Sequence, residues 1–153
     1  QDRKYHHLLR GFNYRMEGFQ GAIMRVKLRH LEKWTEARRR IVSKYNNLLA
    51  GSGVEIPTEM PWARHVYHAY TLRSDDRDGL KTALDAEGIQ TGIHYPVPVH
   101  LQPAYADLGY GPGAFPRSEK AATEVLSLPL YPEMTDAQLE AVSRVVQAGV
   151  HAS

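Results

Sequence analysis

Apolar side chains recur at helical spacing early in the chain. Charged residues fill most of the other places over residues 16–49, and no glycine or proline lies between Gly21 and Gly51. The apolar positions lie mainly three and four residues apart, at Phe19, Ile23, Val26, Leu31, Trp34, Ile41, Tyr45 and Leu48. This pattern predicts one amphipathic helix over residues 16–49, which Gly51 ends. The helix would be roughly 50 Å long, which is typical of one that links two bodies or lines an interface.

The next part of the chain alternates between strand-like and helix-like segments. Residues 66–73 and 89–94 are rich in β-branched and aromatic side chains, which predicts a strand in each. Between them, Leu80, Ala83 and Leu84 fall on one helical face, and Gly88 ends that predicted helix. Two strands joined through a helix are typical of a small sheet that helices cover on one face.

Proline interrupts the region that follows. Residues 96–103 are rich in proline, which disrupts helices and central strands, so we expect an extended loop there. Residues 104–117 are expected to be a loop with one helical turn. A short helix is predicted over 118–125, an extended piece over 127–130, and a last helix from the cap residue Thr135 to about position 148. The expected fold class is α+β, with an interface loop and a long linking helix in residues 1–50 and a small sheet-and-helix domain in residues 51–153.

The composition excludes several kinds of protein. The chain has 153 residues and a net charge of +2, with acidic and basic residues interspersed, so we expect no nucleic-acid partner. It has no cysteine, which rules out disulfides and thiolate metal sites. No apolar run suits a membrane span and no signal peptide opens the chain, so we expect a cytoplasmic protein without a membrane partner. The polar start without an initiator methionine suggests part of a longer protein.

A turn followed by polar side chains marks the entry to the predicted long helix. Gly11 permits backbone angles closed to other residues, and Asn13 suits a turn or a helix cap. Tyr14 and Arg15 follow where backbone N–H groups and the helix dipole favour an anion. The segment is therefore a candidate phosphate contact, and an ordinary capped helix is the alternative explanation of the same residues.

Three segments of the chain follow a recognisable order. Residues 10–23 contain Arg-Gly-Phe-Asn-Tyr-Arg-Met-Glu-Gly-Phe-Gln-Gly-Ala-Ile, and residues 91–105 contain Thr-Gly-Ile-His-Tyr-Pro-Val-Pro-Val-His-Leu-Gln-Pro-Ala-Tyr. Residues 115–122 and 126–132 complete the set with Phe-Pro-Arg-Ser-Glu-Lys-Ala-Ala and Leu-Ser-Leu-Pro-Leu-Tyr-Pro. Together they resemble the DegT/DnrJ/EryC1/StrS family of sugar-nucleotide aminotransferases that depend on pyridoxal 5'-phosphate. The resemblance covers almost the whole chain and implies the C-terminal part of a fold-type I aminotransferase.

The resemblance also implies that a cofactor-binding domain precedes residue 1. Such an enzyme needs a lysine that binds the cofactor covalently and shuttles protons. The resemblance matches none of the chain's lysines to that cofactor lysine; they are Lys4, Lys27, Lys33, Lys44, Lys81 and Lys120. We therefore expect that lysine upstream, no catalytic residue in these 153 positions, and no transamination by this stretch alone.

Several binding residues are implied in the same way. Asn13 matches a residue that reaches the cofactor phosphate of the other subunit in a homodimer, and Arg15 matches one near the partner's active site. His94 and Tyr95 match residues that line the sugar-nucleotide site, and His100 is a weaker candidate for it. The structural alternatives are an ion pair for Arg15, loop anchoring for His94 and Tyr95, and loop bracing for His100. No metal site is expected, because His94 and His100 lack a third ligand.

The expected function follows from the resemblance. It is transamination of a nucleotide-linked keto-deoxysugar, with glutamate as the amino donor, and the stretch from His94 to Leu101 favours the 3-oxo over the 4-oxo sugar. Two alternatives stay open. One is a sugar dehydratase of the same family, in which a histidine replaces the upstream lysine. The other is a non-catalytic helical regulatory or interaction module that uses the basic residues Arg38, Arg39 and Arg40.

Overall fold

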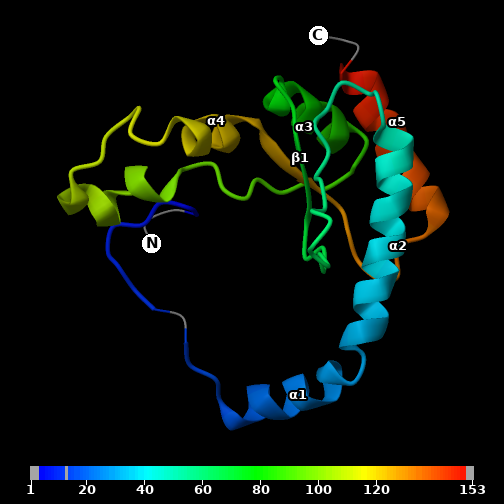
Figure 1. Ribbon diagram of the computed structural model, residues 1–153, viewed down its shortest axis with the longest axis horizontal. Helices are drawn as coiled ribbons and strands as arrows, with labels where there is room; N and C mark the ends of the chain where they lie inside the picture. Colours follow the sequence, from blue (N-terminus) through cyan, green and yellow to red (C-terminus); the bar gives the residue numbers. More distant parts are fainter. Residues whose placement is uncertain (1–3, 13, 151–153) are drawn as a thin grey trace.

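The computed structural model describes residues 4–12 and 14–150 of the chain (Figure 1). In chain order its elements are helices α1 (Gly18–Leu28) and α2 (Leu31–Leu49), strand β1 (Tyr70–Arg73), helix α3 (Arg77–Ala86), the 3₁₀ helices η1 (Val99–Leu101) and η2 (Pro103–Leu108), helix α4 (Pro116–Glu124), strand β2 (Val125–Leu128) and helix α5 (Asp136–Val150). The α+β class predicted from the sequence is confirmed. No helix in the described ranges is both long and apolar enough to span a membrane.

The predicted single long helix is wrong in one respect, because the chain turns at Arg29 and His30. Their N–H groups donate to the carbonyls of Val26 and Lys27, three residues back, at 3.2 and 2.9 Å, so the α-helical ladder breaks there. Helix α1 runs in a different direction from α2 and ends near the lower end of α2 (Figure 1). The apolar period continues through the turn, but α2 buries a face whereas α1 buries none of its residues. Within the described chain, tertiary packing therefore fixes only the second helix.

Helix α1 also begins later than predicted. Its N-cap is Glu17, whose backbone N–H donates to the side-chain oxygen of Gln20 at 3.0 Å. The two residues form a capping box, which satisfies N–H groups that the first helical turn leaves without partners. Asn13, the candidate cap, lies outside the described residues.

The core lies between a two-stranded antiparallel sheet and three helices. Strands β1 and β2 pair so that Tyr70 faces Leu128 and Arg73 faces Val125. Helix α5 packs against both α2 and α3. The rings of Tyr45 and Tyr70 stack with centroids 4.8 Å apart, and both side chains are fully buried. The buried apolar residues of all three helices and both strands form one cluster, which is the main source of stability.

The sheet is smaller than the sequence predicted. Strand β1 occupies only the last four positions of the predicted strand 66–73. The predicted strand 89–94 is wrong: only Gly92 pairs, exchanging backbone hydrogen bonds with Ser127 at 3.0 and 2.7 Å. The extended piece predicted at 127–130 overlaps strand β2 only at positions 127 and 128, because the strand begins at Val125 and ends before Pro129, a residue without an N–H group for the ladder. The composition therefore predicted more strand residues than the fold pairs in its sheet.

Most helix ends follow the predicted signals. Gly51 and Gly88 have φ angles of 73° and 71° just after α2 and α3, in the left-handed region that glycine tolerates. Thr135 caps α5: its hydroxyl accepts from the N–H of Gln138 at 3.3 Å, and the Gln138 side chain accepts from the N–H of Thr135. The proline-rich stretch 96–103 forms neither a strand nor an α-helix, as predicted, but it is not simply extended, because η1 lies within it and η2 begins at Pro103.

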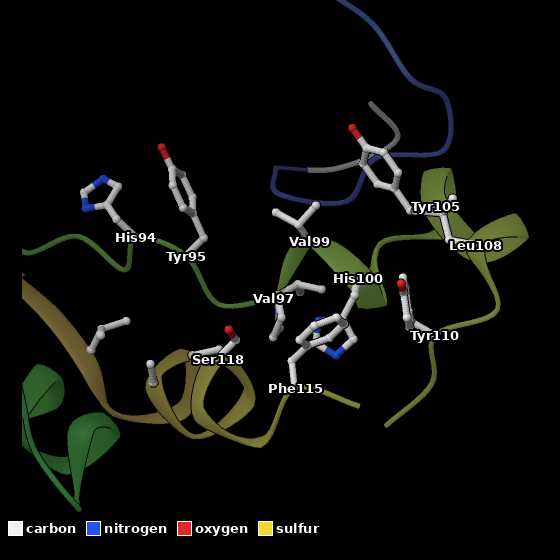
Figure 2. A pocket seen from close by; sticks show the side chains of 14 residues that line it. His94, Tyr95, Val97, Val99, His100, Tyr105, Leu108, Tyr110, Phe115 and Ser118 are labelled. Carbon is white, nitrogen blue, oxygen red and sulfur yellow. The ribbon is translucent and has the colours of Figure 1, made fainter. Parts of the chain in front are cut away.

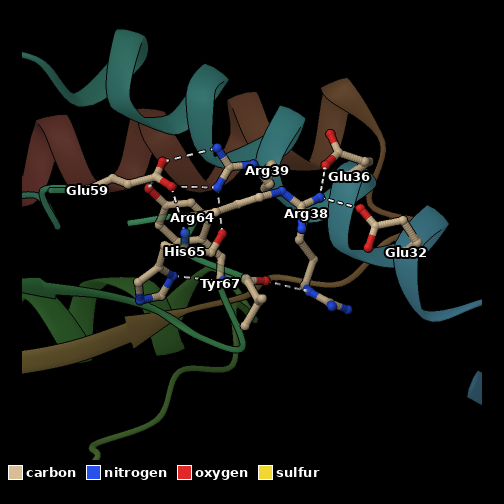
Figure 3. A network of polar contacts seen from close by, with 9 residues as sticks. Glu32, Glu36, Arg38, Arg39, Glu59, Arg64, His65 and Tyr67 are labelled. Carbon is tan, nitrogen blue, oxygen red and sulfur yellow. Dashed lines mark hydrogen bonds and ion pairs between the residues drawn. The ribbon is translucent and has the colours of Figure 1, made fainter. Parts of the chain in front are cut away.

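Segment 57–68 has no regular structure, and Glu59 ties it to α2 (Figure 3). The Glu59 carboxylate accepts hydrogen bonds from Arg39 at 2.7 and 3.2 Å and from the backbone N–H of His65 at 2.6 Å. Arg39 also donates to the carbonyl of His65 at 2.6 Å. These bonds, chiefly the one from Arg39, lower the pKa of Glu59 to about 2. The carboxylate therefore stays ionised and holds the segment at all ordinary pH values.

Two further arginines also join the same segment to α2. Arg64 forms ion pairs with Glu32 and Glu36 of α2 (Figure 3). Arg38 donates to the carbonyl of Val66 and to the hydroxyl of Thr35, both at 3.2 Å. Arg38 and Arg39 of the basic cluster are therefore used in internal contacts, whereas Arg40 is exposed.

Candidate functional site

A groove of 610 Å³ lies between the proline-rich segment and α4 (Figure 2). Its walls are mostly aliphatic and aromatic, including Val97, Val99, Tyr105, Leu108, Tyr110 and Phe115. The polar side chains on it are His94, Tyr95, His100 and Ser118. Apolar walls with a few polar groups are typical of small-molecule sites. The structure thus brings together His94, Tyr95 and His100, the three candidates from the second sequence motif.

His94 is held by the sheet behind it. Its Nδ1 lies 2.9 Å from the hydroxyl of Ser127 on β2. The Ser127 hydroxyl lies 2.8 Å from that of Thr71, directly across the strand pair. Gly92 makes room for the ring, because a Cβ atom there would lie 2.6 Å from Cε1 of His94. A rigid element therefore orients the imidazole through Nδ1 and leaves Nε2 for another partner.

Tyr95 is exposed, with 63% of its surface accessible. Its ring packs edge-on against Tyr5, with centroids 5.6 Å apart. Tyr5 is held in turn, because its carbonyl accepts a hydrogen bond from the side chain of Gln102 at 3.0 Å. Gln102 also accepts from the N–H of His7. The described N-terminal segment therefore lies beside the groove and supports one face of Tyr95.

His100 is placed differently from the other two. Its side chain is only 9% exposed, and its Nε2 lies 3.0 Å from a carboxylate oxygen of Glu119 on α4. Its ring meets Phe115 edge-on, with centroids 4.8 Å apart. His100 therefore lines the groove mainly as a packed ring, an arrangement that agrees with the bracing alternative.

The first sequence motif lies apart from this groove. Arg15 is exposed and is not among the groove's lining residues. The segment that carries it leads away toward α1 (Figure 1). Asn13, the candidate for the cofactor phosphate, lies outside the described residues. The structure thus does not join the two motifs within one chain.

The positions of the lysines decide whether a cofactor could be attached in the groove. None of the chain's lysines that the structure describes lines the groove. Lys44, Lys81 and Lys120 form ion pairs with Asp136, Asp85 and Glu124 on helix surfaces. The polar groups on the groove are imidazoles, phenols and a hydroxyl, which suit hydrogen bonds to sugar or phosphate oxygens. These residues fit one wall of a pyridoxal-phosphate enzyme's substrate site, and not the covalent attachment point.

No cluster of three or more histidine, aspartate or glutamate side chains in the described ranges is arranged to hold a metal ion.

Sequence reasoning missed two residues that shape the site, Ser127 and Glu119. Both lie inside motifs that carried the family resemblance, yet neither was a candidate for the site. Ser127 is a polar residue between two leucines on a buried strand. Glu119 is an acidic residue in the first turn of a helix, where it has an ordinary capping explanation. The signal that the sequence offered for Ser127 was a hydroxyl side chain within an otherwise apolar strand.

Similarity to known proteins agrees with this arrangement. The sequence model of the DegT/DnrJ/EryC1/StrS aminotransferase family matches residues 1–147. Identity is 45% over 142 residues to a pleiotropic regulatory protein of Geobacillus stearothermophilus, covering 91% of this chain and 38% of the relative. It is 41% over 155 residues to the dTDP-3-amino-3,4,6-trideoxy-alpha-D-glucose transaminase of Streptomyces venezuelae, covering 95% and 41%.

Comparison with solved structures indicates the same family. The solved structure of DesV from S. venezuelae aligns with a TM-score of 0.84 at 40% identity, covering 97% of this chain and 40% of that one. The helices, small sheet and groove are thus the kind of unit found in fold-type I aminotransferases. The chain belongs to the DegT/DnrJ/EryC1/StrS aminotransferase family. It spans about 40% of the length of the relatives it matches.

Proposed function

We propose that the whole protein is a cytoplasmic, pyridoxal-phosphate-dependent aminotransferase that aminates a nucleotide-linked keto-deoxysugar, with glutamate as the amino donor. The observation that supports this most directly is the mostly apolar groove that His94 and Tyr95 line, in a member of this family. The 3-oxo sugar is favoured over the 4-oxo sugar. The name of the S. venezuelae relative, a 3-amino sugar transaminase, supports that preference.

His94 and Tyr95 bind the sugar nucleotide in this proposal. Nε2 of His94 is left for the ligand because Nδ1 is next to Ser127, and the Tyr95 phenol can both donate and accept a hydrogen bond. The aliphatic and aromatic walls exclude water from the less polar part of the sugar. When bound, the cofactor supplies the electron sink through which the amino group moves.

The chain's organisation supports a shared site. Residues 51–153 form the small C-terminal domain in this proposal, residues 1–50 form the interface loop and linking helices, and the cofactor-binding domain lies upstream. Asn13 binds the cofactor phosphate and Arg15 the substrate of the neighbouring subunit in a homodimer. Helix α1, which buries none of its residues in this chain, leaves a surface for such contacts.

The test uses the full-length protein purified with its cofactor. We expect that a 3-oxo nucleotide sugar gains one amino group in a glutamate-dependent reaction, and that the 4-oxo isomer is aminated more slowly. Mass spectrometry of the sugar product measures both reactions. His94→Ala should raise KM for the sugar nucleotide more than it changes the reaction with glutamate alone. Asn13→Ala should weaken retention of the cofactor.

Other outcomes would give other functions. Loss of water from the sugar without gain of an amino group would identify the dehydratase alternative. Unchanged cofactor retention in Asn13→Ala would remove the shared-site role of that residue.

A regulatory role is the competing proposal, because one relative is named a pleiotropic regulatory protein. The basic cluster on α2 gives it little support. Arg39 is paired with Glu59, and Arg38 donates to Thr35 and to a backbone carbonyl. Salt-dependent binding of nucleic acid by the full-length protein, without any bound cofactor, would favour regulation over catalysis.

A further inference from the structure

One carboxylate holds together the aromatic side of the groove. Glu119, in the first turn of α4, accepts hydrogen bonds from the backbone N–H of Gly113 at 3.0 and 2.9 Å and from that of Phe115 at 3.1 Å. The same carboxylate lies 3.0 Å from Nε2 of His100. Glu119 thus joins three parts of the groove: helix α4, the loop before it and the 3₁₀ helix η1.

The loop that Glu119 holds has little structure of its own. Residues 109–115, all of them described, form neither helix nor strand. Gly109 and Gly113 have φ angles of 72° and 87°, which only glycine adopts easily. The loop nevertheless carries Tyr110 and Phe115, whose rings pack edge-on with centroids 5.1 Å apart and line the groove. Its position therefore depends on bonds from outside the loop.

The charge of Glu119 also fixes His100. Hydrogen bonds from the loop N–H groups lower the pKa of the Glu119 carboxyl, so it is ionised at neutral pH and can only accept. Nε2 of His100 must then carry a proton, and the imidazole donates to the carboxylate. The ring is committed to this contact and to Phe115. His100 therefore forms part of the groove's wall, and its contact with Glu119 fixes the position of that wall.

We propose that Glu119 is a positioning residue for the sugar-nucleotide site: it holds His100, Tyr110 and Phe115 as one aromatic wall without touching the ligand itself. This inference rests on the proposed function. The ordinary explanation of Glu119, a charge at a helix start that only stabilises α4, predicts lower stability with unchanged ligand binding. The two roles therefore differ in a measurable way.

The experiment compares full-length wild type with Glu119→Gln and Glu119→Asp, and with Glu140→Gln as a control at an exposed position on α5. Three quantities are measured: amide hydrogen exchange over residues 109–115, the Kd for dTDP-glucose by calorimetry, and the rate with glutamate in the absence of sugar. In Glu119→Gln we expect exchange at Gly113 and Phe115 to rise about tenfold, and Kd to rise about fivefold or more. The rate with glutamate should stay within about twofold of wild type, as should all three values in Glu140→Gln.

Three results would overturn the inference. They are unchanged exchange in the loop, faster exchange with an unchanged Kd, and an equal loss in sugar binding and in the reaction with glutamate. If Glu119→Gln does not fold, Glu119→Asp decides, because its shorter side chain keeps the charge but cannot reach all three partners; wild-type values in Glu119→Asp would count against the proposal. Failure of the proposed function is seen separately, as wild-type protein that binds dTDP-glucose but transfers no amino group.

Discussion

Nδ1 of His94 lies 2.9 Å from the hydroxyl of Ser127, on a strand that is far from it in the sequence. The bond connects the groove to the buried sheet, since Ser127 is 5% exposed. Thr71 extends the contact to the neighbouring strand. The His94 side chain, although it lies on an irregular segment, is thus held in a fixed orientation by the sheet. A binding group requires such a fixed orientation.

Ser127→Ala removes that contact while leaving the strand pairing intact. A neutral hydrogen bond contributes about 0.5–1.5 kcal/mol, so KM for the sugar nucleotide should rise about two- to tenfold in the full-length enzyme. The rate with glutamate alone should not change. Steady-state kinetics measure the first value and single-turnover absorbance the second. Ser43→Ala, at an exposed serine of α2, is the control; an equal effect in both variants would show that Ser127 does not orient His94.

Gly92→Ala should disturb His94 directly. The added Cβ would lie 2.6 Å from Cε1 of the ring, so the exposed imidazole must swing away from Ser127. Because a side chain rather than backbone moves, the free energy of unfolding should change by less than about 1 kcal/mol, while KM rises at least as much as in Ser127→Ala. Gly111→Ala, where no atom lies within 4 Å of the new Cβ, should leave both values unchanged. An unaltered KM in Gly92→Ala would contradict the assigned orientation.

Leu84→Ala tests the core beneath the site. The Leu84 side chain is fully buried on α3, in the cluster that this helix shares with α5. Removing such a side chain costs about 2–5 kcal/mol of unfolding free energy, because it leaves a cavity. Urea denaturation of the full-length protein measures the loss. Leu9→Ala, at a side chain that is 86% exposed, should cost less than about 0.5 kcal/mol.

The hydrogen bonds to the Glu59 carboxylate should make the stability of the protein depend on pH under acidic conditions. The pKa of Glu59 in the folded protein, about 2, lies below the ordinary value of 4.5. The contribution of Glu59 to stability is therefore present above pH 4.5 and is lost as the pH falls toward 2. Glu59→Gln should therefore lower the melting temperature at pH 7, and its difference from wild type should shrink between pH 4.5 and pH 2. Thermal unfolding monitored by circular dichroism at several pH values measures both effects. A constant difference across that range would show that the Glu59 charge contributes nothing.

The sequence determined the local features whose cause lies within a few residues. Gly51 and Gly88 end helices because each adopts a positive φ, and Thr135 begins one because its hydroxyl accepts from the first turn. The apolar period of α2 also predicted its buried face, with Ile41 and Tyr45 in the core. The resemblance carried in three motifs predicted the fold class and the meeting of His94, Tyr95 and His100.

Only the tertiary structure decided what depends on distant partners. The apolar period extends through Arg29 and His30, so nothing local indicated the turn between α1 and α2. Residues 89–94 have strand composition, but a strand needs a neighbour, and the sheet offers Gly92 only one pairing partner. The roles of Ser127 and Glu119 were equally hidden, because each acts on a residue far along the chain. Side-chain character is local, whereas hydrogen-bond partners are assigned by the fold.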